Sequence, residues 1–356
     1  MQWRIYANDP NWVPPLRMAV RDLLDPARHP FHQHAEMQCF LALRDGEAVG
    51  RVCAVVNHRS NEFHDEKVGT FGLFETIDDA DVARALLDAA ADWLRGRGMR
   101  LMRGPMNLST NDELYGPGVL INGFDTPPTV MMAHAPRYYQ SLVEGSGLEK
   151  ARDLIAYWMD APEPPPRLRR MYDRLRRTEG VRIRSLNMKR LDAEIDLILQ
   201  IYNSAWERNW GFVPFTEDEI RHLAKELKPV VAPEYCPLVF VDDEPVAFAL
   251  ALPDFNQALH HLDSGRLLPF GIFKLLWHRR NIDRIRVLTL GIKPGYRNRG
   301  FDAAMIAHIM IESGKRDQAR GECSWILEDN LEMRNAIERA GGHEYKRYRV
   351  YEKQLQ

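Results

Sequence analysis

A glycine- and arginine-rich turn gives this sequence its clearest sign of chemistry. An apolar run at residues 287–292 leads into Arg297-Asn298-Arg299-Gly300, and apolar residues at helical spacing begin at Ala303. A helix that starts at such a turn directs unpaired backbone N–H groups at one point, with the positive end of the helix dipole behind them. The turn therefore predicts a site for a pyrophosphate. Taken alone, the segment is equally compatible with a plain strand-to-helix connection that carries two solvated arginines.

The cysteines and histidines form no pattern typical of a nucleophile or a metal centre. Four cysteines lie in or beside apolar runs without a C-x-x-C pair: Cys39, Cys53, Cys236 and Cys323. We expect all four to be reduced, buried thiols. His29, His32 and His34 have only loosely metal-like spacing, with no nearby carboxylate or cysteine pattern. We therefore expect no metal site.

Length and composition limit the classes of protein that remain. The chain has 356 residues, which at roughly 150 residues per domain predicts two domains. Its 48 basic and 50 acidic side chains nearly cancel, so we expect no nucleic-acid partner. The N-terminus lacks the apolar stretch of a signal peptide, and no run approaches the roughly 20 apolar residues of a membrane span. We expect a cytoplasmic protein without a membrane span.

The two halves of the chain repeat one order of predicted elements. Each half has a hairpin, a further strand, an amphipathic helix and a closing strand that ends at asparagine. In the first half these elements fall at residues 40–56, 68–74, 79–95 and 100–107, and in the second at 238–252, 285–292, 302–315 and 323–330. The repeated series predicts an α/β fold and a duplicated domain.

A proline cluster at residues 161–166 separates the two series. Clustered prolines lack amide donors and hold the chain extended, so neither a helix nor a central strand can cross them. We therefore predict one domain at residues 1–160, a linker with a short helix at 161–180, and a second domain at 181–356.

This order of elements, with its arginine-glycine turn, resembles the GCN5-related N-acetyltransferase (GNAT) superfamily. The family signature Gln/Arg-x-x-Gly-x-Gly/Ala corresponds here to residues 297–302, and Asn330 stands eleven residues before Gly341, as a helix-opening asparagine does in the family. The whole chain is similar to tandem GNAT proteins of bacteria. The resemblance implies two tandem GNAT-like domains, each a mixed, mostly antiparallel sheet flanked by helices. In the first domain the matching turn, residues 75–81, has four carboxylates and no glycine, so we expect no phosphate loop there.

The resemblance also implies a cofactor site in the second domain. Acetyl-CoA or a longer acyl-CoA would serve as co-substrate, its pantetheine along the backbone of the third family strand and its pyrophosphate in the turn. The residues implied are Leu290, Gly291, Ile292, Arg297, Asn298, Arg299, Gly300 and Asn330. Asp302 replaces the final small residue of the signature, and we expect it to cap the helix rather than face the phosphates.

The groups for proton transfer are less clear from the sequence. Many GNAT members carry a tyrosine seven residues after the helix-opening asparagine as proton donor to the thiolate, and that position here is Ile337. The thiolate must then be protonated by another residue or by water. Glu328, at the end of a strand near the implied cleft, is the candidate catalytic proton acceptor, with a surface cap as its alternative role.

Acceptor-binding residues are implied at two places. Trp206 and Glu207 follow the first helix of the second domain and offer an apolar wall and a carboxylate, although an ordinary aromatic core has the same pattern. Asn256 lies in the long connection after the second hairpin. We predict an acyl-CoA-dependent N-acyltransferase that acts on the amine of a small molecule by direct transfer; the sequence leaves a homodimer open. The alternatives are an enzyme similar to long-chain N-acyl amino acid synthases and a catalytically silent sensor of CoA or a metabolite.

Overall fold

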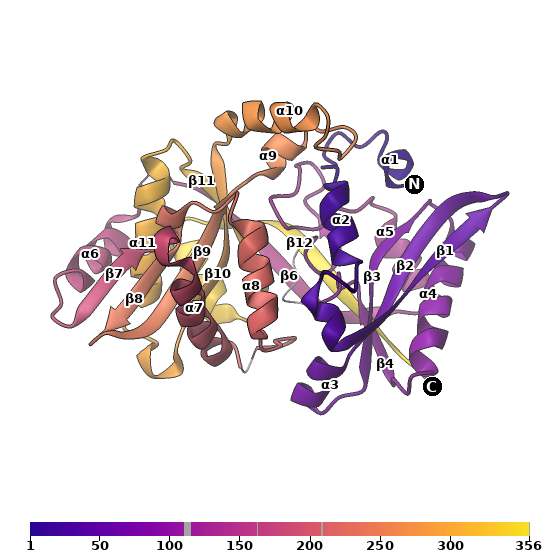
Figure 1. The fold of residues 1–356 in the computed structure, drawn as a ribbon, viewed down its shortest axis with the longest axis horizontal. Helices are drawn as coiled ribbons and strands as arrows, with labels where there is room; N and C mark the ends of the chain where they lie inside the picture. The colour runs from indigo at the N-terminus through magenta and orange to yellow at the C-terminus, as the bar shows by residue number, and fades with distance from the viewer. Residues whose placement is uncertain (110–114, 162, 208, 356) are drawn as a thin grey trace.

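One continuous sheet runs through the molecule. The computed structural model describes residues 1–109, 115–161, 163–207 and 209–355. In these residues twelve strands form a sheet in the order β1-β2-β3-β4-β12-β6-β11-β10-β9-β8-β7, with β5 beside β12 (Figure 1). The N-terminal half occupies one end of the molecule and the second half the other, with helices packed on the sheet.

The first half is a meander of strands covered by one long helix. Its elements are α1 (Gln2–Ile5), α2 (Arg17–Leu23), η1 (Pro30–Gln33), β1 (Ala35–Arg44), β2 (Glu47–Asn57), α3 (His58–His64), β3 (Val68–Thr76), α4 (Ala80–Arg95), β4 (Leu101–Gly104), β5 (Val119–Asn122) and α5 (Tyr139–Gly145). Asp79 caps α4 by accepting hydrogen bonds from the amides of Asp81 and Val82. Every third or fourth residue of α4, from Val82 to Leu94, is buried against the sheet, as expected of an amphipathic helix.

The second half repeats this plan with helices on both faces. Its elements are α6 (Pro166–Leu175), β7 (Val181–Ser185), η2 (Met188–Arg190), α7 (Leu191–Ala205), α8 (Glu217–Leu227), η3 (Pro233–Tyr235), β8 (Pro237–Val241), β9 (Glu244–Pro253), α9 (Asn256–Leu259), α10 (Gly271–His278), η4 (Arg279–Asn281), β10 (Arg284–Ile292), η5 (Pro294–Tyr296), α11 (Phe301–Gly314), β11 (Arg320–Leu327) and α12 (Leu331–Arg339). Successive side chains of a strand point to opposite faces. Leu238 and Phe240 accordingly pack with α7, while Val239 packs with α6 and α11.

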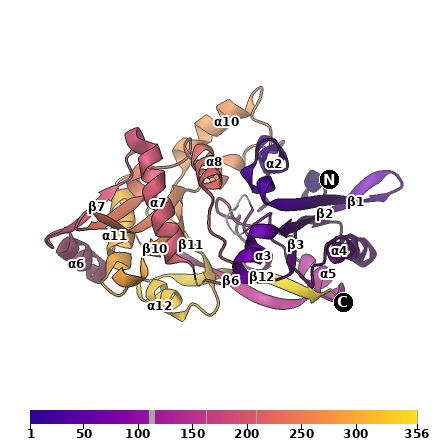
Figure 2. The same cartoon turned by 60° about the horizontal axis from the view of Figure 1, so that its bottom comes forward.

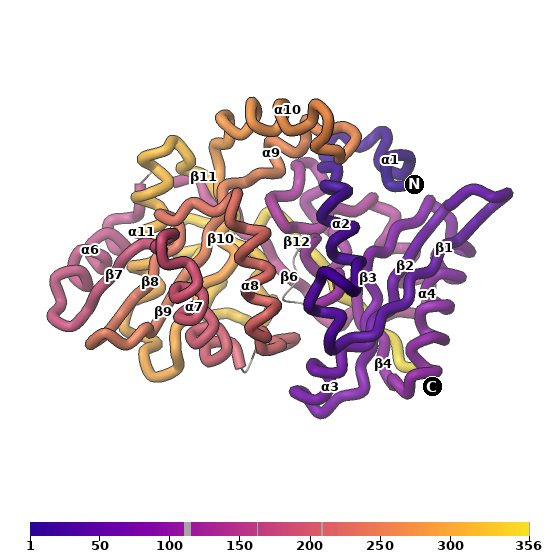
Figure 3. The backbone as a smooth tube through the Cα atoms, viewed as in Figure 1, coloured from indigo at the N-terminus to yellow at the C-terminus, as the bar shows by residue number. Residues whose placement is uncertain are grey.

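Two strands join the halves. β6 (Glu149–Asp160) pairs with β11 on one side, and β12 (His343–Gln354) lies between β6 and β4, so the last strand of the chain completes the sheet of the first half. Figures 2 and 3 show both strands at the centre of the molecule. The domain boundary at residues 161–180 stays a prediction, since strands from both sides of it share one sheet; Pro162 of the linker lies outside the described residues.

The predicted α/β fold, with a mixed, mostly antiparallel sheet flanked by helices, is confirmed, although the strands of both halves form one continuous sheet. Both hairpins are present, as β1–β2 and β8–β9, and each is followed by a strand, a helix and a parallel strand. Among the described helices, none has both the length and the apolar character that crossing a bilayer requires.

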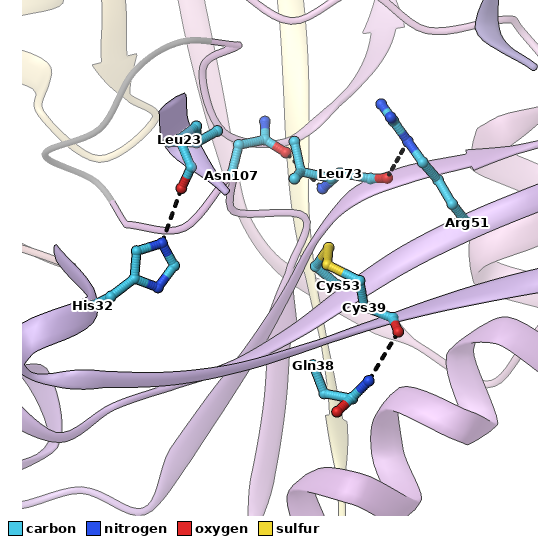
Figure 4. The surroundings of a disulfide bond; sticks show 8 residues. All are labelled: Leu23, His32, Gln38, Cys39, Arg51, Cys53, Leu73 and Asn107. Carbon is cyan, nitrogen blue, oxygen red and sulfur yellow. Dashed lines mark hydrogen bonds between the residues drawn. A yellow bond between two sulfur atoms is a disulfide. The ribbon is translucent and has the colours of Figure 1, made fainter. Parts of the chain in front are cut away.

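The expectation of four reduced cysteines is wrong for two of them. Cys39 on β1 and Cys53 on β2 form a disulfide, drawn in Figure 4. The two residues stand directly opposite each other in the antiparallel ladder, with their Cα atoms 4.1 Å apart. Cross-strand neighbours at such close spacing can be bridged without moving the backbone. Cys236 and Cys323 are free and buried, as expected.

Candidate functional site

The site is built around a gap between β10 and β11. These parallel strands pair only from Arg284 opposite Arg320 to Val287 opposite Cys323. β10 then continues to Ile292 and β11 to Leu327 without further pairing between them. Beyond Val287, the edge of β10 that faces β11 therefore has backbone groups that no described strand engages. This is the opening that the GNAT resemblance implies.

Gly291 is buried beneath an aromatic ring, on the stretch of β10 that does not pair with β11. A Cβ atom at this position would lie 2.1 Å from the ring of Trp206, so only glycine permits the contact. Leu290, Gly291 and Ile292 border the cleft, as the sequence predicts for residues that follow a pantetheine chain. Trp206, which follows α7, therefore shapes the wall of the opening.

The turn between β10 and α11 has the backbone geometry that its glycine predicts. Gly300 is the N-cap of α11 with φ 82°, and no side chain caps this helix end. The first-turn amides of α11 are thus available to a ligand. Arg297 and Asn298 border the cleft, and Arg297 donates to the carbonyl oxygen of Ala205 at 2.7 Å. Arg299 lies over the rings of Tyr296 and Phe301, 5.3 and 5.4 Å from their centroids.

Asp302 does not form the cap that the sequence predicts. The N-cap is Gly300, and Asp302 lies in the first turn of α11 and borders the cleft. A carboxylate at a helix N-terminus is stabilised by the dipole, but it repels a neighbouring phosphate. An anionic ligand at this turn must therefore approach from the side of Arg297 and Asn298.

A polar cleft of about 890 Å³ lies between the two halves in front of this turn. The second half contributes β10, the turn and α12, and the first half contributes α3, β3 and β4. Arg103 on β4 and Arg152 on β6 both lie near Trp210, each guanidinium 5.4 Å from the ring centroid. Arg152 forms an ion pair with Asp329. The first half thus supplies cationic side chains to a cleft whose turn belongs to the second half.

An apolar cavity of about 280 Å³ adjoins the polar cleft. The two share wall residues at the strand gap, among them Trp206, Leu290 and Met333. The cavity extends between the sheet and helices α7 and α8, where its lining is almost wholly aliphatic or aromatic: Leu191, Ile195, Ile198, Leu223, Ala224, Leu227, Phe248 and Leu250. Ile337, at the position of the family tyrosine, is part of the same apolar wall and offers no proton.

The predicted site residues after β11 have different surroundings. Asn330 caps α12, accepting a hydrogen bond from the amide of Met333 at 3.2 Å, and borders both the cleft and the cavity. Glu328 borders neither: its carboxylate accepts from Lys150 Nζ at 2.7 Å and from the amide of Asp153 at 3.0 Å. A catalytic role for Glu328 stays a prediction. It is disfavoured because both oxygens of the carboxylate already accept hydrogen bonds from residues of β6.

Two of the three predicted acceptor-binding residues lie at the cleft and one does not. Trp206 and Glu207 border the polar cleft, as expected. Asn256 lies elsewhere, because its side-chain amide donates to the carbonyl oxygens of Pro128 and Thr129 at 3.0 and 2.9 Å. It therefore holds a loop of the first half against the second half.

A buried charged network behind the cavity escaped the sequence analysis. Ser324 borders the apolar cavity, and its Oγ accepts from Arg286 Nε at 2.8 Å while donating to the Glu322 carboxylate. Tyr345 also donates to Glu322, and Arg286 lies 3.9 Å from the same carboxylate. The side chains of Arg286 and Glu322 are both fully buried. Charged residues facing each other within two apolar strands were the available signal.

Burial also perturbs titrating groups close to this network. It raises the pKa of Asp254 to about 7, although Asp254 accepts a hydrogen bond from the amide of Val130 at 2.8 Å. It lowers the pKa of Lys346 to about 8, and this ammonium donates to the carbonyl oxygens of Gly123 and Thr126. These groups fasten the loop at residues 123–130 to the second half.

The histidines singled out in the sequence have protein partners. His32 Nε2 lies 3.0 Å from the carbonyl oxygen of Leu23, and His34 Nε2 lies 3.0 Å from Glu219. In the described residues a different group, Asp22, His222 and Glu226, brings three candidate ligand atoms within 4.8 Å of one another. His222 lies 3.2 Å from Asp22, the distance of an ordinary ion pair.

Comparison with known proteins gives relatives across nearly the whole chain. Protein YghO of Escherichia coli strain K12 is 38% identical over 360 residues, 99% of this chain and 90% of that protein. The bacterial ceramide synthase of Caulobacter vibrioides strain NA1000 / CB15N is 40% identical over 363 residues, 99% of this chain and 92% of that protein. No protein-family model matches.

Solved structures show the fold. A GCN5-related glucosamine N-acetyltransferase region of a fungal multidomain enzyme superposes with a TM-score of 0.59 at 15% identity, covering 99% of this chain and 36% of that one. A tandem GNAT protein from the clavulanic acid biosynthesis pathway superposes with a TM-score of 0.57 at 9% identity, covering 98% of this chain and 91% of that one. A GCN5-related N-acetyltransferase of Sphaerobacter thermophilus superposes with a TM-score of 0.52 at 14% identity, covering 90% of this chain and 81% of that one.

Proposed function

This chain belongs to the same family as the Caulobacter bacterial ceramide synthase and YghO and has the tandem GNAT fold, and from that premise we propose that it transfers a long acyl group from CoA to a primary amine. The observation that carries the proposal is the gap between β10 and β11, where a polar cleft adjoins an apolar cavity. A thioester needs both environments, because its CoA portion is polar and charged whereas its acyl chain is hydrocarbon.

The donor's CoA portion is assigned to the second half. The uncapped N-terminus of α11 and the side chain of Arg297 suit a pyrophosphate, and the unpaired edge of β10 suits the amides of a pantetheine chain. The matching turn of the first half has Asp79 as a helix cap, and its carboxylates repel phosphate. One donor site per chain follows.

The hydrocarbon chain is assigned to the apolar cavity between the sheet and helices α7 and α8. Its aliphatic lining favours a long chain, since each buried methylene contributes about 0.8 kcal/mol. A ceramide is the fatty amide of a long-chain amino alcohol, so the name of the Caulobacter relative supports a long-chain amine as acceptor. The polar cleft, with Glu207 on its border, would receive the amine.

Ser324 and Glu322 are the groups best placed to move protons at the gap. One proton of the acceptor ammonium passes through Ser324 Oγ to the Glu322 carboxylate, and the neutral nitrogen attacks the thioester carbonyl. The C–N bond forms, the C–S bond breaks, and a second proton from nitrogen goes to the thiolate to give free CoA. Arg286 fixes Ser324 in place through a 2.8 Å hydrogen bond to its Oγ.

Donor binding is tested with a pair of glycine variants. Gly300→Val should abolish binding of CoA and palmitoyl-CoA in native mass spectrometry, because valine is strained at φ 82° and its side chain, with Cβ 2.7 Å from Met171, alters the turn that would receive the pyrophosphate. Gly341→Val is the matched control, since Gly341 also has a positive φ but nothing within 4 Å of an added Cβ. Unchanged binding in Gly300→Val, or equal loss in both variants, would contradict the assignment.

The proton path is tested separately by pH. Ser324→Ala should reduce kcat most at low pH, where the acceptor is an ammonium, and the deficit should shrink as pH rises and the free amine appears. Cys323→Ala is the neighbouring control and should leave the profile unchanged. A pH-independent deficit in Ser324→Ala would remove the relay, and CoA binding without any amide product would favour the sensor alternative.

A further inference from the structure

The molecule carries an exposed apolar surface on α10, none of whose residues lines the cleft or the cavity at the gap. Five large apolar side chains within residues 268–277 stand in solvent: Leu268, Phe270, Phe273, Leu276 and Trp277. Phe270 is 75% exposed, and Phe273 and Trp277 are each 67% exposed. Figures 1 and 2 both show α10 at the outer edge of the molecule, and Figure 1 shows it above α9. An exposed apolar patch of this kind marks an interaction site.

The exposed residues share one face of the helix. Phe270, Phe273 and Trp277 follow i, i+3, i+7 spacing, which stacks side chains along one side. The opposite side packs on the protein: Ile272 and Leu275 are partly buried, and His278 stacks on the ring of His261 with centroids 3.7 Å apart. The helix is thus fixed with its apolar face outward.

The loop that leads into α10 is hydrogen-bonded to the N-terminal region of the chain. Arg17 donates from its amide to the carbonyl oxygen of Gly265 and from Nε to that of Ser264, each at 2.9 Å. Since the helix has these anchors on its inner side, its aromatic residues are exposed in a defined orientation.

Basic residues surround the apolar face. Residues 263–281 contain Arg266, Lys274, Arg279 and Arg280, all exposed, against one acid, Asp263, which lies 3.8 Å from Lys274. Aromatic and aliphatic side chains flanked by cations are typical of helices that lie in the interface of a membrane and attract anionic lipids. A second copy of the chain fits less well, because a two-fold contact would bring the same cations face to face.

We propose that residues 266–280 form a docking surface for an anionic phospholipid bilayer, with Phe270, Phe273 and Trp277 entering the interface and the four basic side chains binding lipid phosphates. The surface is separate from the acyltransferase gap and does not depend on the proposed activity. It would place the protein at a membrane without a spanning helix.

The test is vesicle co-sedimentation of the purified full chain. The protein should sediment with vesicles of mixed phosphatidylcholine and phosphatidylglycerol, bind phosphatidylcholine vesicles at least tenfold more weakly, and be released by added salt. Phe273→Ser/Trp277→Ser should weaken binding to the anionic vesicles at least tenfold. Arg279→Gln/Arg280→Gln should weaken that binding and leave the residual affinity for phosphatidylcholine unchanged.

A matched control uses apolar residues exposed elsewhere. Leu41 and Leu43 on β1 are 66% and 64% exposed, so Leu41→Ser/Leu43→Ser removes two apolar side chains of similar fractional exposure and should leave vesicle binding intact. Equal loss in this control, or no loss in the α10 variant, would overturn the proposal. So would a dimer that dissociates in Phe273→Ser/Trp277→Ser, since the face would then serve a second copy. No readout involves turnover, so failure here leaves the proposed acyl transfer untouched.

Discussion

Filling the apolar cavity should change which acyl donors the protein accepts. Ala224 on α8 lines the cavity, and the neighbouring Lys225 is exposed and does not. Ala224→Trp places an indole inside a space of about 280 Å³, close to the lining aliphatic residues of α7. A long acyl chain must then stop short of its natural depth, whereas a short chain never reaches the indole.

The size of the effect follows from the buried surface lost. If the indole excludes about three methylene groups, at about 0.8 kcal/mol each, the long donor loses about 2.4 kcal/mol of binding. Because about 1.4 kcal/mol is a factor of ten, kcat/KM for palmitoyl-CoA should fall about fiftyfold. The value for octanoyl-CoA should change by no more than about twofold.

The assay is release of free thiol from both donors with one long-chain amine as acceptor. Lys225→Trp is the control: it adds the same side chain to the outer side of the same helix and should leave both values unchanged. An equal loss on both donors would mean general damage rather than a shortened cavity. No loss on either, or the same selectivity change in Lys225→Trp, would refute the assignment of the acyl chain to this cavity.

Three further predictions concern the buried charges and thiols. The folded-state pKa of Asp254, about 7, lies above the ordinary value of 3.8, so the free energy of unfolding of the wild type falls as pH rises between those values. Asp254→Asn does not titrate, so in urea unfolding its free energy of unfolding should rise relative to that of the wild type by about 2–3 kcal/mol from pH 5 to pH 8. Arg286→Met leaves the Glu322 carboxylate buried without its cation and should lower the free energy of unfolding by about 3–5 kcal/mol, and adding Glu322→Gln should recover much of this in the same assay. Burial raises the pKa values of Cys236 and Cys323 to about 12, so both thiols stay protonated and Cys236→Ala and Cys323→Ala should retain acyl transfer; a trapped acyl-cysteine would contradict direct transfer.

The repeated elements could be predicted from the sequence because each is defined by a local pattern of residues. The hairpins, the helix after each third strand and the glycine turn before α11 all depend on residues close in the chain. The disulfide depends on a detail that local patterns do not show. Extending the register of the turn from Arg44 opposite Glu47 would place Cys39 opposite Val52, and a bulge between Ala42 and Leu43 shifts the pairing so that Cys39 faces Cys53.

The path of the last strand could not be predicted for a related reason. The residues of β12 alternate between polar and apolar, as in any half-buried strand. Nothing in that pattern selects β4 and β6 as neighbours over the strands of the second half. The choice is made by pairing between residues far apart in the chain, as between Tyr351 and Gly104. Residues from the two halves consequently meet in a cleft that neither half contains alone.

The candidate site was predicted where a backbone motif defines it and missed where packing does. Gly291, Arg297 and Asn330 border the cleft because strand, turn and helix cap follow from the motif. Glu328 follows the end of β11, but its carboxylate is bound by Lys150 on β6 and does not border the cleft. Ser324 was not selected from the sequence because its proposed role depends on the buried Glu322 carboxylate to which it donates a hydrogen bond.

The most direct test of the account is product formation from defined substrates. Purified protein is incubated with palmitoyl-CoA and a long-chain amino alcohol, and amide and free CoA are measured together by liquid chromatography with mass spectrometry. We predict one N-palmitoyl amide for each CoA released, and loss of both in Gly300→Val but not in Gly341→Val. Release of CoA without amide, or amide formed equally by Gly300→Val, would contradict acyl transfer at the gap between β10 and β11.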